Sequence, residues 1–133
     1  MPGDWFLWLR RLPLAYRRHP LASLADIEAN FRIVQRHARG HQQVPLEAIG
    51  GSLNRTATFD HRFRPTPKCD HLRLARITSA LIAGVEFAPV ELVLVQGLYY
   101  VVDGHHRVAA ARALKRATIA AVVTEWIVEE RQT

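Results

Sequence analysis

The stretch VVDGHHRVAAARAL, residues 101–114, joins two β-branched apolar residues to an alanine-rich helical run through Asp103 and Gly104. Gly104 permits a tight turn at this junction, and the first amides of the following helix have no partners within the helix. Because those amides lie at the positive end of the helix dipole, they attract anions. Arg107, in the first turn, can reach back over the same place with a forked contact to phosphate. The pattern predicts a phosphate-binding strand-to-helix turn, with an ordinary capped helix as the alternative.

The acidic and imidazole side chains of this turn suggest different roles. Asp103 competes with an incoming anion, so it is either a plain N-cap or, beside a phosphate, a ligand of Mg²⁺ or a proton acceptor. His105 and His106 are neighbours about 100° apart on a helix and cannot readily share one metal ion. A metal-binding helix commonly carries histidines four residues apart, which this one does not. We therefore expect no metal bound by these histidines, one histidine lining the anion site and the other packing or capping.

The order of the elements around the turn predicts a compact α+β domain. Two apolar runs, residues 89–95 and 98–102, flank Gln96-Gly97 and are typical of a β-hairpin. The other expected elements are an amphipathic helix over 23–39 between Ser23 and Gly40, a short edge strand over 43–49, a long loop over 50–68, a helix over 71–83 between Asp70 and Gly84, a helix over 105–115 and a strand over 118–126.

Composition limits the classes of protein to consider. The 133 residues suit one domain, and a single cysteine, Cys69, cannot form an internal disulfide or a cysteine zinc site. No apolar run is long enough to cross a membrane, and we expect a cytoplasmic protein. The formal charge of +6 comes from sixteen arginines and two lysines against twelve acidic residues. Such a surface attracts phosphorylated ligands and, as an alternative, nucleic acid.

The first twenty residues combine aromatic and basic side chains. The apolar group is Trp5, Phe6, Trp8 and Leu9, and arginines follow it rather than precede it. A secretory signal places its positive charge first, so secretion is not expected. We expect these aromatics to cap the core or pack against a protein partner, with contact to a membrane surface as the alternative.

The sequence around the turn resembles the ParB/sulfiredoxin superfamily. The resemblance covers residues 43–126 and is carried by GLYYVVDGHHRVAAARAL at 97–114 and IAAVVTEW at 119–126. IGGSLNRTATFDHRF at 49–63 resembles the Gly-Ser-x-x-Arg and Phe-Asp segment of small ParB-like domain proteins. The resemblance implies a small mixed sheet packed with helices. It divides the chain into an N-terminal helical extension, residues 1–42, and a ParB-like domain, residues 43–128.

The resemblance also implies a ligand and a set of site residues. In this superfamily the Gly-x-x-Arg turn binds nucleotide phosphates, and ADP, ATP or CTP with Mg²⁺ are the expected cofactors. The implied phosphate-binding residues are Gly104, His105, His106 and Arg107 from the turn, with Ser52, Asn54 and Arg55 closing the site from the long loop.

The branches of the superfamily imply different chemistry. Sulfiredoxins carry a catalytic cysteine where this chain has His105, and Cys69 lies outside the motif, so sulfinic acid reduction is not expected. Partition ParB proteins add a helix-turn-helix domain, which we do not expect here. The Asp-Gly-His-His-Arg turn is most similar to the branch of the ADP-dependent serine kinase. There the turn's acid, matched by Asp103, acts with an upstream acid, for which Glu47 and Asp60 are the candidates.

Three functions remain open from the sequence. The first is nucleotide binding with NTP hydrolysis or phosphoryl transfer, with Asp103 as the catalytic residue. The second is a DNA-binding or nuclease-type ParB-like protein that uses the arginine-rich surface. The third is a non-catalytic adaptor that docks through its aromatic N-terminus.

Overall fold

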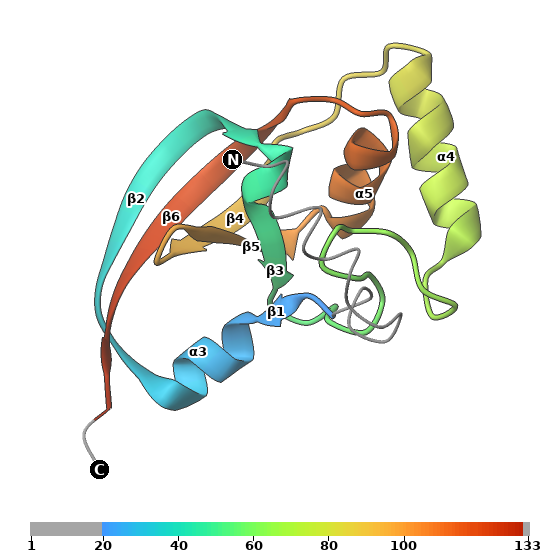
Figure 1. Cartoon of the computed structure of the whole chain (residues 1–133). Helices are drawn as coiled ribbons and strands as arrows, with labels where there is room; N and C mark the ends of the chain where they lie inside the picture. The colour runs from blue at the N-terminus through green and yellow to red at the C-terminus, as the bar shows by residue number, and fades with distance from the viewer. Residues whose placement is uncertain (1–19, 132–133) are drawn as a thin grey trace, which may run out of the picture.

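The computed structural model describes residues 20–131 and contains one mixed sheet with helices on both faces (Figure 1). The sheet has six strands in the order β1-β3-β5-β4-β6-β2, which confirms the predicted α+β class. In chain order the elements are β1 (Ala22–Ser23), α3 (Leu24–Asn30), β2 (Phe31–Pro45), the short 3-10 helix η1 (Leu46–Ala48), β3 (Ile49–Ser52), α4 (His71–Ile82), β4 (Val90–Val95), β5 (Leu98–Asp103), α5 (His105–Ala113) and β6 (Thr118–Glu130).

The centre of the sheet is the predicted hairpin. Strands β4 and β5 pair antiparallel, and the two turn residues, Gln96 and Gly97, both have positive φ, at 49° and 84°. This geometry matches the twist of the flanking strands. Strand β3 runs parallel to β5 on one side and β6 runs parallel to β4 on the other. The hairpin therefore fixes the position of the end of β5, from which the turn at Gly104 departs.

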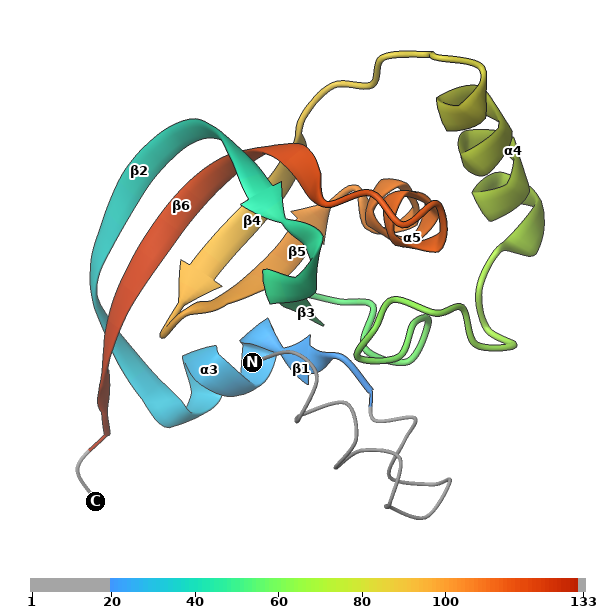
Figure 2. The ribbon, with the colours of Figure 1, turned by 45° about the horizontal axis from the view of Figure 1, so that its top comes forward.

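The helix expected over residues 23–39 is wrong beyond Asn30. Ser23 caps α3 as expected, accepting a hydrogen bond from the Asp26 amide at 3.3 Å, but the chain then becomes the long strand β2. Strand β2 pairs antiparallel with β6 along its whole length, and the two form an arched ribbon (Figures 1 and 2). Gly40, at φ 71°, lies at an irregularity of this ladder instead of ending a helix.

The edge strand expected over residues 43–49 is also wrong as a unit. Its first three residues end β2, the next three form η1, and Ile49 begins β3, which is paired on both sides. The boundary expected between residues 42 and 43 falls inside β2. Pairing with β6, about eighty residues further along the chain, supplies β2 with backbone hydrogen bonds that no local pattern reveals.

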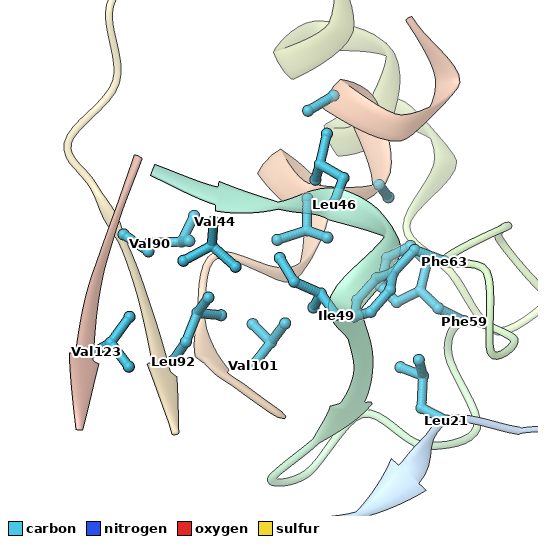
Figure 3. Close-up of a cluster of buried hydrophobic side chains, with 14 of the residues drawn as sticks. Leu21, Val44, Leu46, Ile49, Phe59, Phe63, Val90, Leu92, Val101 and Val123 are labelled. Carbon is cyan, nitrogen blue, oxygen red and sulfur yellow. The ribbon is translucent and has the colours of Figure 1, made fainter. Parts of the chain in front are cut away.

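Two hydrophobic clusters lie on opposite faces of the sheet. The larger one joins the sheet to α5, η1 and the loop after β3, and Figure 3 shows most of its side chains. Its members are Leu21, Val44, Leu46, Ile49, Phe59, Phe63, Cys69, Val90, Leu92, Val101, Val108, Ala109, Ala111, Ala121 and Val123. The smaller cluster packs α3 against the other face through Leu24, Val93, Val95 and Tyr100.

Helix α4 lies outside α5 and is reached through the long loop after β3 (Figure 2). Asp70 caps it as expected, accepting from the Arg73 amide at 3.0 Å, and none of its residues is fully buried. Helices α4 and α5 both begin beside the loop, so their N-terminal ends lie on the same side of the molecule (Figures 1 and 2). Within residues 20–131, no helix has the length and apolar character needed to span a membrane.

Candidate functional site

The turn between β5 and α5 requires glycine for two reasons. Gly104 has φ 105°, a conformation that side chains rarely adopt. A Cβ at this position would also lie 2.5 Å from Cγ1 of Val90 and 3.0 Å from Nη2 of Arg107. The first hydrogen bond of α5 runs from the Val108 amide to the Gly104 carbonyl. The amides of the three residues before Val108 therefore precede the helical ladder, as at the start of any α-helix.

Asp103 and Arg107 form an ion pair across this turn. Nη2 of Arg107 lies 3.0 Å from Oδ2 of Asp103, and Nη1 donates to the Ala88 carbonyl at 2.5 Å. The Asp103 side chain is 73% exposed, whereas that of Arg107 is 17% exposed. Arg107 thus reaches back over Gly104, but its guanidinium is held by groups of the protein. A phosphate at the turn would compete with the Asp103 carboxylate for this arginine.

His105 is buried and bonded to the end of β3. Its Nε2 lies 2.7 Å from Oγ of Ser52, and the residue is 7% exposed. The same Oγ accepts hydrogen bonds from the amides of Asn54 at 3.2 Å and Arg55 at 2.8 Å, so its own hydrogen is available to the imidazole. Burial, followed by the nearby charge of Arg55, lowers the pKa of His105 to about 4. His105 is therefore neutral at physiological pH and joins the loop to the helix.

His106 is equally buried, but one of its ring nitrogens makes no hydrogen bond to any residue from 20 to 131. It is 7% exposed, its ring packs edge-on against Phe59 at 5.4 Å between centroids, and its Nε2 has no hydrogen-bond partner among residues 20–131. Burial lowers the pKa of His106, and the charges of Arg73 and Arg55 lower it further, while Asp70 acts in the opposite direction. Two arginines from different segments thus lie near the imidazole. A buried nitrogen without a partner costs about 1–3 kcal/mol, which a ligand or water removes.

The structure brings the expected site residues together in two groups. Ser52, Asn54, Arg55, His105 and His106 meet beside the loop. Asp103 and Arg107 lie across Gly104, toward Ala88. Sequence reasoning missed Arg73 and Phe59 near His106, although the capping of α4 by Asp70 places Arg73 at the start of a helix.

Neither candidate for a second acid accompanies Asp103 in this arrangement. Asp60 organises its own loop, since its carboxylate accepts from the amides of Arg62 and Arg64 at 2.9 Å and from Nε of Arg64 at 2.7 Å. Glu47 lies in η1, and its charge acts on Arg112 near the far end of α5. Among residues 20–131, no three His, Cys, Asp or Glu side chains converge as a metal site. Mg²⁺ at Asp103 would therefore need ligands from the phosphates of a nucleotide and from water.

Cys69 and part of the basic surface have structural partners. Cys69 is buried in the main cluster, and burial, with a smaller contribution from Asp70, raises the pKa of its thiol. On the β2–β6 ribbon, Arg32 pairs with Glu129 and Arg39 pairs with Glu125. The aromatic residues expected to dock a partner lie outside the described residues.

Comparisons with known proteins find similarity to solved structures. No protein-family model matches the sequence, and no curated protein matches it. Among solved structures, sulfiredoxin from Arabidopsis thaliana is similar at 22% sequence identity and a TM-score of 0.48, with 62% of this chain and 82% of that chain covered. A likeness of this size does not extend to activity.

Proposed function

We propose that this chain is a ParB/sulfiredoxin-type domain that binds the phosphate groups of a nucleotide at the start of α5. The observation that carries the proposal is the state of His106 at the N-terminal end of a nine-residue helix: its Nε2 is buried and has no hydrogen-bond partner within the described part of the chain. Arg55 and Arg73 lie near the same ring and supply positive charge from the loop and from α4. Amides, imidazole and guanidinium groups together suit a phosphate.

The proposed roles follow from the position of each group. The amides of residues 105–107 point toward the phosphate from the helix start, and His106 donates through Nε2. Ser52 holds Asn54 and Arg55 against the turn through its two amide contacts, so Arg55 closes the site from the loop. His105 is a positioning residue, because its Nε2 is engaged by the buried Ser52 hydroxyl and its ring packs near Phe63.

Hydrolysis or phosphoryl transfer is the chemistry that Asp103 can add. Its carboxylate is exposed and lies next to the turn, where it can ligate Mg²⁺ together with phosphate oxygens or accept a proton from an attacking hydroxyl. Phosphoryl transfer depends mainly on positioning and charge stabilisation, so a sparse set of side chains suffices. The titration below compares ADP, ATP and CTP as the bound nucleotide.

Isothermal titration calorimetry with pyrophosphate, ADP, ATP and CTP tests this proposal. The informative variants are Arg55→Gln and His106→Phe, and the matched control is Arg76→Gln, an exposed arginine of α4. We expect micromolar binding of one nucleotide, at least a tenfold loss in both site variants, about 1.4 kcal/mol, and no change in the control. Absence of binding at millimolar concentration, or equal affinity of Arg55→Gln and wild type, would overturn the proposal.

A further inference from the structure

A separate cavity of about 850 Å³ lies beside the second half of α5. It opens between η1, the loop segment 62–65 and the end of α5, and all three segments contribute apolar residues to its walls. These wall residues are Pro45, Leu46, Phe63, Pro65, Leu74, Ala109, Ala113 and Ala117. Small-molecule sites in proteins typically have volumes of about 300–1,000 Å³ and mostly apolar walls, so this cavity has the size of a ligand site.

The charged residues that line the cavity are mostly basic. Arg62, Arg64, Arg112, Lys115 and Arg116 line it, against one carboxylate, Glu47. Asp60, within the loop, pairs with Arg64.

Arg112 is fixed within this lining. Its Nη1 donates to the carbonyls of Leu46 at 3.0 Å and Ile49 at 3.3 Å, and it is half-buried. Burial, followed by the charge of Arg62, lowers the pKa of Arg112, while Glu47 and Asp60 act in the opposite direction. Like charges gathered beside apolar walls repel one another, and an anion in the cavity relieves that repulsion.

Two turns of the backbone shape the wall of the same cavity. Within residues 20–131, three residues other than glycine have positive φ, and two of them, Phe63 and Lys115, both at 58°, line the cavity. The third, Gln96, belongs to the hairpin turn, which needs that conformation. Lys115 lies in the turn that ends α5, where its amide donates to the Arg112 carbonyl and the Arg116 amide donates to the Ala111 carbonyl. Phe63 lies in a loop turn that its amide closes with the Asp60 carbonyl.

We infer that this cavity is a binding site for a small organic anion, with its apolar body against Pro65, Leu74 and Ala113 and its acidic group among the basic residues of the rim. The site is distinct from the proposed phosphate site at the start of α5. The ring of Phe63 lies between the two, because it lines the cavity and packs 6.4 Å from the ring of His105. The inference therefore does not depend on nucleotide binding.

The test uses the fluorescent anion 8-anilinonaphthalene-1-sulfonate as the probe, which combines aromatic rings with one acidic group. The blocking variant is Ala113→Leu, since Ala113 is exposed, lines the cavity and lies on a helix that leucine favours. Its matched control is Ala75→Leu on the exposed face of α4. Arg62→Gln and Lys115→Gly reduce the positive charge, with Arg76→Gln as their control. The neutral dye N-phenyl-1-naphthylamine measures how much of the affinity depends on the acid.

The inference predicts one probe molecule bound per chain with micromolar affinity. Ala113→Leu should weaken binding at least tenfold and the charge variants about threefold or more, while both controls retain wild-type affinity. The neutral dye should bind at least tenfold more weakly, and saturating pyrophosphate should not displace the probe. Near-ultraviolet circular dichroism and melting temperature establish that each variant is folded. Unchanged affinity of a folded Ala113→Leu, equal binding of the neutral dye, or displacement by pyrophosphate would each overturn the inference.

Discussion

The hydroxyl of Ser52 and Nε2 of His105 lie 2.7 Å apart, and this contact joins the end of β3 to the first residue of α5. Ser52 is fully buried and also accepts two amides of the loop that follows it. One hydroxyl thus organises the sheet, the loop and the helix start at once. Residues 54, 55 and 105 are held together by this hydroxyl, so a change at Ser52 affects both the proposed site and the stability of the fold.

Acid should destabilise the protein through His105. Its pKa is about 4 in the folded protein and about 6.5 in the unfolded chain, so protonation favours unfolding. Its contribution is complete above pH 6.5 and is lost as the pH falls toward 4. Between pH 7 and pH 5 this single group should remove about 2 kcal/mol from the free energy of unfolding. Urea unfolding at a series of pH values measures the loss.

The control for this prediction is His105→Gln, which does not titrate. Its free energy of unfolding should depend less steeply on pH between 7 and 5 than that of wild type, whatever its absolute stability. His106 keeps a residual slope in the variant, since its pKa is lowered in the same direction. Identical slopes for both proteins would contradict the assignment.

Ser52→Ala removes one oxygen atom and should nevertheless lower the free energy of unfolding substantially. In Ser52→Ala the buried Nε2 of His105 and two loop amides lose their partner, and a buried unsatisfied polar group costs about 1–3 kcal/mol. Ser79→Ala, an exposed position of α4, provides the matched control and should change stability by less than about 0.5 kcal/mol. Chemical denaturation measures the free energy of unfolding of both variants. Equal losses at the two serines would show that the buried network does not contribute to stability.

The parts of the fold that local sequence determines were predictable. The hairpin at Gln96-Gly97 and the capping of α4 by Asp70 depend on residues within a few positions of one another, and both are confirmed. The helix over 23–39 was wrong because its apolar residues also suit a strand. The ladder between β2 and β6 joins residues such as Phe31 and Glu130, and no local pattern contains that information.

The candidate site also contains features that local sequence determines and features that only the fold brings together. The turn at Gly104 and the start of α5 are local features, so the sequence predicted them together with the exposed Asp103. The isolation of Nε2 of His106 depends on Phe59 and on the start of α4, which the loop brings near only in the folded chain. The cavity beside Arg112 likewise forms from three separate segments. Contacts between such distant segments form only in the folded chain, so the sequence alone did not predict them.

Gly104→Ala should destabilise the protein through both the backbone and packing. The added Cβ would lie 2.5 Å from Val90 Cγ1 and force a positive φ, at a combined cost of about 2–4 kcal/mol. Gly84→Ala provides the control, because Gly84 has φ 85° but open space around it, and should cost only about 1 kcal/mol. The double variant Gly104→Ala with Val90→Ala should cost less than the sum of the single variants. Strict additivity in urea unfolding would exclude the clash with Val90.

Cys69 should be a slow-reacting thiol. It is buried within the main cluster and its pKa is raised, so little reactive thiolate is present at pH 8. As the chain's single cysteine, it gives a signal from one site. Reaction with Ellman's reagent should be at least tenfold slower in the native protein than in urea, where one equivalent reacts. A native rate equal to that in urea would show that the cluster does not enclose this residue.

Asp103→Asn should separate binding from chemistry at the proposed nucleotide site. If the carboxylate ligates Mg²⁺ or accepts a proton, nucleotide hydrolysis with Mg²⁺ should fall at least about a hundredfold. Affinity for the same nucleotide without Mg²⁺ should be unchanged or higher, because the variant removes a negative charge beside the phosphates and releases Arg107 from its ion pair. Glu91→Gln is the matched control, since Glu91 is exposed and lies opposite Asp103 in the β4–β5 ladder. Phosphate release and calorimetry measure the two effects. Hydrolysis that survives in Asp103→Asn, or that falls equally in Glu91→Gln, would remove Asp103 from the catalytic role and leave the turn as a site of binding alone.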